Sequence, residues 1–129
     1  MKMILLVMPA LAMLSAVVVA ATFQSSGQVR HVVVFKFKES ATAAQIQQIT
    51  TAFAGLKDTI PGVVSFEHGV NHSPEGLNKG FTHVFFLTFV DAKARDAYLP
   101  HPDHQKFGEL LGSLGIMDDV FVVDYTPAP

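Results

Sequence analysis

Hydrophobic residues recur at every second position in four stretches of the chain, residues 29–38, 63–70, 82–89 and 120–125. Alternation of this kind is typical of β-strands with one face buried, because successive side chains point to opposite faces of a sheet. We therefore predict four strands. The residues that share one face are His31, Val33, Phe35 and Phe37 in the first stretch, and His83, Phe85, Leu87 and Phe89 in the third.

Between the first two strands, apolar residues recur at spacings of three and four, which is typical of a helix. Thr42 followed by Gln45 forms a capping-box start, and Pro61-Gly62 ends the pattern, so a helix is predicted from residue 43 to about 58. The apolar positions of this helix are Ile46, Ile49, Phe53, Leu56 and Ile60.

A second helical region lies between the third and fourth strands and contains a break. Asp91 is a plausible N-cap for a short helix that Pro100 stops, and Pro102 suits the first turn of a new helix. In the new helix one side carries His104, Phe107, Leu110, Leu111 and Leu114.

The order β-α-β-β-α-β predicts an α+β, ferredoxin-like fold, a four-stranded antiparallel sheet with helices on one face. Val32, Val34, Val84 and Phe86 fall on the opposite face of the same strands. An open apolar face of that size is rare in monomers. A second copy related by two-fold symmetry is the simplest cover, so we predict a homodimer.

The N-terminal residues have the pattern of a secretory signal peptide. Residues 4–21 are apolar except for Pro9 and Ser15, they follow a basic Lys2, and they end in small residues before a polar stretch. We expect a signal peptide at 1–21, a linker at 22–28 and the domain at 29–127. The predicted location is secreted or periplasmic, and the alternative is an uncleaved N-terminal helix that anchors the chain in a membrane.

Composition excludes several classes of function. The net charge is −2 and no basic stripe is present, which argues against nucleic acid as a partner. Without cysteine there is no disulfide, thiol catalysis or thiolate metal site. No glycine-rich phosphate loop or nucleophile motif appears, so covalent catalysis is disfavoured and no cofactor is expected. The mature domain is not expected to bind a membrane unless the N-terminal segment is retained.

The residues most able to carry chemistry lie at the helix break, in YLPHPDH at 98–104. A neutral His104 imidazole can accept a proton near physiological pH, and the Tyr98 hydroxyl can donate to a developing enolate oxygen. Each also has a structural reading, His104 as an early helix residue and Tyr98 as a core aromatic residue. His101, between two prolines, fits a role in fixing the loop or capping the next helix. His101 and His104 with Asp103 are a weak metal signal, and no metal site is predicted.

Taken together, the segments RHVVVFKFK at 30–38, GFTH at 80–83, YLPHPDH at 98–104 and FVVDYTP at 121–127 resemble the stress-responsive dimeric α/β-barrel (Dabb) family. The resemblance implies a dimer whose two sheets form a shared barrel, and a cavity between sheet and helices. A plant member of the family cyclises a polyketide thioester with an acid/base tyrosine and histidine. By position these match Tyr98 and His104, and a pocket-lining histidine matches His31.

Two functions follow from these observations. The first is a dimeric protein that binds a small hydrophobic molecule without turnover, with His31, Val33 and Phe35 as ligand-binding residues. The alternative is a non-covalent lyase or cyclase that uses Tyr98 and His104 as an acid/base pair on a carbonyl or polyketide-like substrate. An exported protein would not meet intracellular coenzyme A thioesters, so the plant reaction itself is not expected here.

Overall fold

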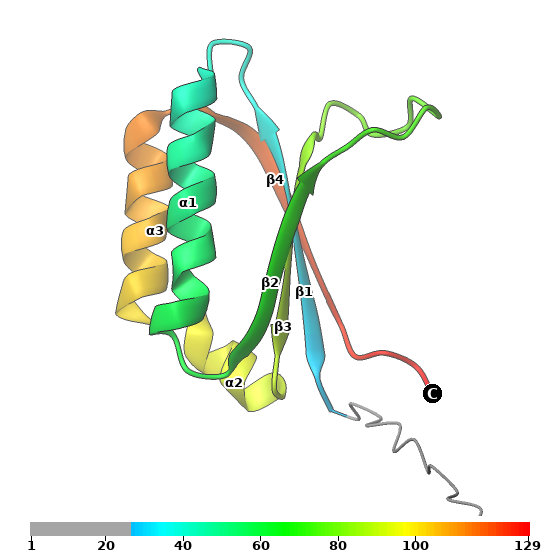
Figure 1. Ribbon diagram of the computed structural model, residues 1–129, viewed down its shortest axis with the longest axis vertical. Helices are drawn as coiled ribbons and strands as arrows, with labels where there is room; N and C mark the ends of the chain where they lie inside the picture. The colour runs from blue at the N-terminus through cyan, green and yellow to red at the C-terminus, as the bar shows by residue number, and fades with distance from the viewer. Residues whose placement is uncertain (1–26) are drawn as a thin grey trace, which may run out of the picture.

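The computed structural model describes residues 27–129, and the predicted signal peptide at 1–21 lies outside them. Four strands and three helices form two layers, with the helices on one face of the sheet (Figure 1). This is the predicted βαββαβ arrangement with a broken second helix. The elements are β1 (Val29–Phe37), α1 (Ala43–Thr59), β2 (Val63–Val70), β3 (His83–Phe89), α2 (Ala92–Tyr98), α3 (Pro102–Leu114) and β4 (Met117–Tyr125).

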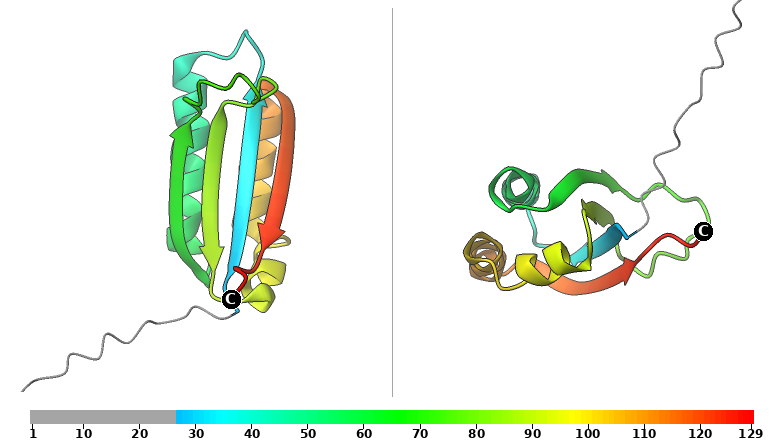
Figure 2. Two further views of the ribbon diagram at one scale, coloured as in Figure 1. Left: turned by 90° about the vertical axis from the view of Figure 1, so that its right-hand side faces the viewer. Right: turned by 90° about the horizontal axis from the view of Figure 1, so that it is seen from below.

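The sheet is antiparallel throughout, in the order β2-β3-β1-β4 (Figure 2, left). β1 is central, and its residues alternate between the helix-covered face and the open face. His31 pairs with Leu87 on β3 and with Asp124 on β4. The last strand begins at Met117, three residues before the predicted start, because the ladder with β1 continues past a register shift at Lys36.

Local signals in the sequence set the helix ends. Thr42 and Gln45 form the predicted capping box, in which the Gln45 N–H donates to the Thr42 hydroxyl oxygen at 3.2 Å. His101 is the N-cap of α3, and its Nδ1 accepts from the Asp103 N–H at 3.2 Å. Pro102 follows at the first helical position, where its missing N–H costs nothing. The second helix therefore breaks between Tyr98 and Pro102, as predicted.

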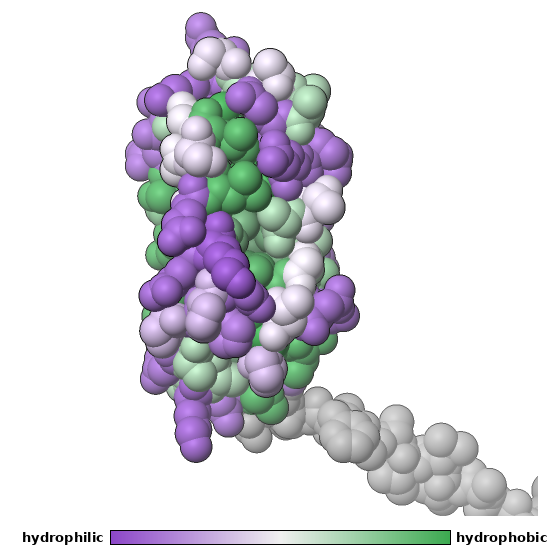
Figure 3. Space-filling model, turned by 90° about the vertical axis from the view of Figure 1, so that its left-hand side faces the viewer, coloured by the Kyte–Doolittle hydropathy of each residue, from purple (hydrophilic) through white to green (hydrophobic). Residues whose placement is uncertain are grey.

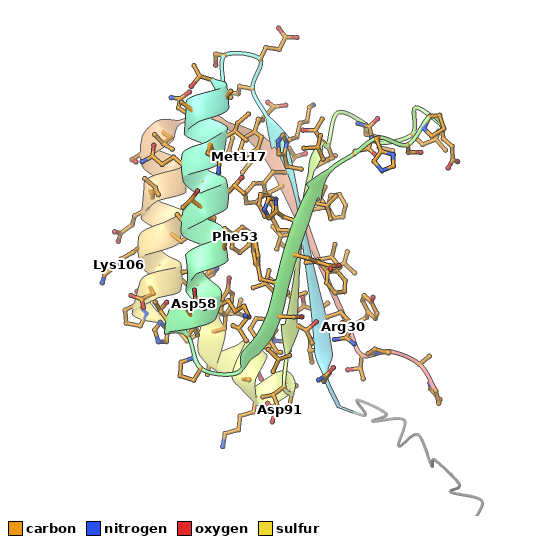
Figure 4. The ribbon with its side chains drawn as sticks, viewed as in Figure 1. Arg30, Phe53, Asp58, Asp91, Lys106 and Met117 are labelled. Atoms are coloured by element: carbon orange, nitrogen blue, oxygen red, sulfur yellow. The ribbon has the colours of Figure 1, made fainter. Side chains whose placement is uncertain are left out.

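Phe53 is the centre of the core. It projects from α1 toward the sheet (Figure 4) and is 2% exposed. Its ring centroid lies 4.5 Å from that of Phe107 on α3, 4.8 Å from Phe85 on β3 and 6.1 Å from Phe35 on β1. Aromatic rings packed this closely join both long helices to the sheet. The phenylalanines of the core cluster thus provide much of the contact between the layers.

One glycine holds the turn between α1 and β2. Gly62 has φ of +89°, and a β-carbon there would lie 2.5 Å from the β-carbon of Ala94 on α2. The turn therefore needs glycine both for its backbone conformation and for the close approach of α2.

The outer surfaces of the two layers differ. Seen from the helix side, hydrophilic residues cover much of the surface, with a band of hydrophobic residues between them (Figure 3). The open face of the sheet is largely apolar, although β2 contributes Ser65 and Glu67 to it. None of the helices in the described part of the chain has the length and hydrophobicity to cross a bilayer. The apolar residues of the open face are Val32, Val34, Val84, Phe86, Phe121, Val123 and Tyr125.

Candidate functional site

A cavity of about 410 Å³ lies between the sheet and α3. Its walls are mostly aromatic and aliphatic, and its polar side chains are two histidines and one carboxylate, a composition typical of small-molecule sites. The predicted ligand-binding residues His31, Val33 and Phe35 all line it, and so does His104. The other lining residues are Phe53, Leu99, Phe107, Gly108, Leu111, Val122 and Asp124.

His104 is held in one orientation by the helix break. Its Nδ1 lies 2.9 Å from the carbonyl oxygen of Leu99. A carbonyl oxygen only accepts, so Nδ1 carries the proton and donates. In the neutral ring Nε2 is then left with a lone pair, which can accept a hydrogen bond or a proton. The backbone at the break before α3 thereby sets the tautomer of His104.

Tyr98 packs directly against His104, with ring centroids 4.4 Å apart, but it does not line the cavity. The side chain is fully buried, and its hydroxyl has no hydrogen-bond partner among residues 27–129. Burial raises the pKa of the phenol, because the charged phenolate is poorly solvated there. The structure therefore brings the two predicted catalytic residues together, with the tyrosine hydroxyl behind the cavity wall.

His31 faces the cavity from β1 and is 5% exposed. Its Nδ1 lies 2.6 Å from Oδ1 of Asp124, its partner across the β1–β4 ladder. The other carboxylate oxygen of Asp124 accepts from the Arg95 guanidinium on α2. A hydrogen-bonded chain from α2 through β4 to β1 thus ends at the cavity.

Asp124 and Arg95 are site residues that the sequence reasoning did not identify. Neither residue belongs to the chemical motif at residues 98–104. An antiparallel pairing of the first and last strands places Asp124 opposite His31, so that signal was present in the sequence. Arg95 depends on where α2 packs, which the local pattern does not encode.

The remaining histidines lie away from this cavity. His83 pairs with Phe35, four residues along β1 from His31, and packs edge-on against Phe37 at 4.9 Å. Burial, and secondarily the nearby His68, lower the pKa of His83. His68 and His72 are exposed. Within the described residues, no three histidine or carboxylate side chains are grouped so that they could hold a metal ion.

Comparisons with known proteins agree with this fold and cavity. The chain is 34% identical over 104 residues to stress-response A/B barrel domain-containing protein HS1 of Arabidopsis thaliana, covering 81% of this chain and 94% of that protein. It is 29% identical over 99 residues to olivetolic acid cyclase of Cannabis sativa, covering 77% and 96%.

Solved structures show the same architecture. A crystal structure of an Arabidopsis thaliana protein matches with a TM-score of 0.73 and 34% identity, covering 78% of this chain and 96% of that one. A Jannaschia protein described as dimeric and ferredoxin-like, of unknown function, matches with a TM-score of 0.67 and 30% identity, covering 78% and 100%.

The family model of the stress responsive A/B barrel domain matches residues 29–127, which include every strand and helix described above. The matched range also contains the cavity-lining residues from all the elements that build the site. The chain belongs to the stress-responsive A/B barrel domain (Dabb) family.

Proposed function

We propose that this protein binds a small hydrophobic molecule in the cavity between the sheet and α3. The observation that carries the proposal is that Phe35, Phe107 and Leu111 line the space beside His104 and leave about 410 Å³ open. Had these large side chains filled that space, no ligand could lie against the histidine. The apolar walls favour a hydrophobic body, and burial of apolar surface is worth about 25 cal/mol per Å².

The polar groups indicate how such a ligand would be oriented. His31 and His104 each have Nδ1 engaged, by Asp124 and by the Leu99 carbonyl oxygen. The Nε2 atom of each neutral ring is therefore an acceptor. A compound with an apolar body and one or two hydroxyl groups, or an acidic C–H beside a carbonyl, fits this arrangement.

A second candidate function is a non-covalent lyase or cyclase, and the His104–Leu99 hydrogen bond favours it. That bond leaves Nε2 as the base that could take a proton from a carbon next to a carbonyl. The bonding electrons would pass to the carbonyl oxygen and form an enolate. The Tyr98 hydroxyl lies outside the cavity lining, so in this arrangement it does not donate to that oxygen. The related Cannabis sativa protein is named a cyclase, which supports this chemistry.

Filling the cavity from α3 tests the binding proposal. Gly108 lines the cavity, and a β-carbon added there meets no atom within 4 Å, so Gly108→Leu should fold while occupying the space. Gly112→Leu is the matched control, on the same helix and equally unobstructed, but outside the lining. Acetophenone and nonane-2,4-dione serve as probes in thermal-shift and calorimetric assays.

We expect the probes to stabilise wild type and Gly112→Leu, and to leave Gly108→Leu unchanged. Equal stabilisation of all three proteins would contradict binding in this cavity. Turnover is tested separately with nonane-2,4-dione, whose C3 protons exchange with deuterium in D₂O. Faster exchange with wild type than with His104→Ala would support the lyase or cyclase function. Equal exchange with the two proteins would contradict it.

We also propose that the protein is a homodimer through the open face of the sheet. Phe121 and Val123 on β4 are 44% and 49% exposed there, and a hollow of about 570 Å³ on this face is lined by Val34, Phe121 and the loop before β3. Apolar patches of this kind mark protein interfaces. Light scattering at micromolar concentration should give a dimer for wild type and a monomer for Val123→Lys. Val90→Lys, exposed to the same degree after β3, should stay dimeric.

We propose further that the protein is exported by way of its N-terminal segment. The support is the sequence pattern of residues 1–21. These residues have a basic start, then an apolar stretch, and then small residues that precede a polar segment. Mass spectrometry of the protein recovered from its producing cells should find an N-terminus near Thr22. A chain that begins at Met1 and sediments with membranes would instead establish the anchor.

A further inference from the structure

A charged chain links α2 to the cavity through the last strand. Arg95 on α2 donates through Nη1 to Oδ2 of Asp124, and Oδ1 of the same carboxylate lies 2.6 Å from Nδ1 of His31. The Arg95 and Asp124 side chains are each 24% exposed and the His31 side chain 6%. We propose that Arg95 is a positioning residue that sets the orientation of His31 in the cavity by fixing the Asp124 carboxylate. This inference rests on the proposed binding function.

His31 depends on Asp124 for its orientation because its other neighbours are apolar or aromatic. Its ring packs edge-on against Phe89 at 5.7 Å and against Tyr98 at 5.9 Å, and these contacts do not distinguish its two nitrogens. Asp124 supplies the one side-chain hydrogen bond that the described residues give to the ring. A buried imidazole with a single polar partner takes its tautomer from that partner, here with the proton on Nδ1.

Asp124 in turn depends on Arg95. It lies on β4, an edge strand, and its side chain is 24% exposed, so packing alone does not confine the carboxylate. Its two side-chain hydrogen bonds within the described residues are those to His31 and Arg95. With one oxygen held by the guanidinium, the other is aimed at Nδ1. Charge-assisted bonds of this type are stronger and more directional than neutral ones.

Arg95 also supplies the counter-charge for the carboxylate. The charged groups around His31 are Asp124 from β4 and Arg95 from α2, and Arg95 is itself contacted by Asp96 at 2.8 Å. The titratable rings beside His31 are Tyr98 and, beyond it, His104. The guanidinium holds Oδ2 of Asp124 while Oδ1 accepts from Nδ1–H of His31. Its Nε2 then remains an acceptor for a ligand.

The competing interpretation is that Arg95 only ties α2 to β4. α2 is a seven-residue helix that already has an Asp91 N-cap, whose carboxylate accepts from the Ala94 N–H at 2.7 Å. A simple tether would affect the stability of α2 without changing the ring nitrogens of His31. The two interpretations therefore differ in what the loss of Arg95 does to the imidazole.

The experiment compares Arg95→Met with Lys93→Met, which removes the same charge from an exposed position on the same helix. Long-range ¹H–¹⁵N spectra of the His31 ring report its tautomer without any ligand, and calorimetry with nonane-2,4-dione reports affinity. In wild type and Lys93→Met we expect one tautomer with the proton on Nδ1. In Arg95→Met we expect a mixture of tautomers and about three- to tenfold weaker binding.

Two further variants sharpen the test. Arg95→Lys should restore the Nδ1–H tautomer in part, since an ammonium can still reach one carboxylate oxygen. Asp96→Ala removes the other contact of Arg95 and should leave the tautomer unchanged. An unchanged tautomer in Arg95→Met, with only a lower melting temperature, would overturn the proposal in favour of a tether. If wild type does not bind the probe, the binding function fails, but the ligand-free spectra still decide the role of Arg95.

Discussion

Replacing Tyr98 with phenylalanine should stabilise this protein. The Tyr98 side chain is fully buried, and its hydroxyl has no partner among the described residues. A buried hydroxyl without a hydrogen bond costs about 1–3 kcal/mol relative to its state in water. Phenylalanine keeps the ring contacts with Phe89 and His104 and removes only the oxygen. We expect a net gain of about 1 kcal/mol, which raises Tm by about 4–8 °C in a domain of this size.

The second tyrosine of the chain is a matched control. Tyr125 is 47% exposed on the open face, and its hydroxyl is not among the buried groups without a partner, so Tyr125→Phe should change Tm by less than about 4 °C. Differential scanning calorimetry and urea unfolding measure both variants. A loss of 1 kcal/mol or more in Tyr98→Phe would refute the reasoning, because it would mean that the hydroxyl makes a favourable hydrogen bond in the folded state. A variant that gains stability but loses ligand binding would identify the hydroxyl as functional, since sites retain groups that destabilise the fold.

The Tyr98 hydroxyl also makes the stability of the fold depend on pH in the alkaline range. Burial raises the pKa of Tyr98 above its unfolded value of about 10, so the unfolded state releases this proton first. The stability associated with the neutral phenol is fully present below pH about 10 and is lost as pH rises toward the folded pKa. With two tyrosines and no tryptophan, absorbance at 295 nm follows each ionisation directly. Unfolding by alkali should shift to higher pH in Tyr98→Phe.

Two further predictions concern the opposite end of the sheet and the α1–β2 turn. Burial, with a smaller contribution from His68, lowers the pKa of His83, so the unfolded state binds a proton first and stability should fall as pH drops below about 6.5. His83→Gln should flatten that acid dependence in a urea titration, and His72→Gln, an exposed loop change, should keep it. Gly62→Ala should destabilise by more than 1 kcal/mol because of its positive φ and a 2.5 Å clash, whereas Gly55→Ala, unobstructed in α1, should stabilise by about 0.5–1 kcal/mol. Equal melting temperatures for the two glycine variants would contradict this account of the turn.

The arrangement of the elements could be predicted from the sequence because each signal is local. Period-two alternation identified the strands, the Thr42–Gln45 box and Pro102 set helix starts, and the break at Pro100 separated α2 from α3. The prediction that His31, Val33 and Phe35 share a buried face also depended only on alternation. Successive side chains in a strand point to opposite faces, so which residues share a face follows from their positions in the sequence alone.

The chemistry of the site was decided by contacts between distant segments. The sequence by itself established the family, the order of strands and helices, and the presence of Tyr98 and His104 at a helix break. Only the tertiary structure decided that the Tyr98 hydroxyl is buried behind the cavity wall while His104 faces the cavity. It also decided that Asp124 contacts both Arg95, 29 residues away in the sequence, and His31, 93 residues away. The physical reason is that hydrogen bonds and burial depend on which segments meet in space, and a period of two or of three to four residues carries no such information.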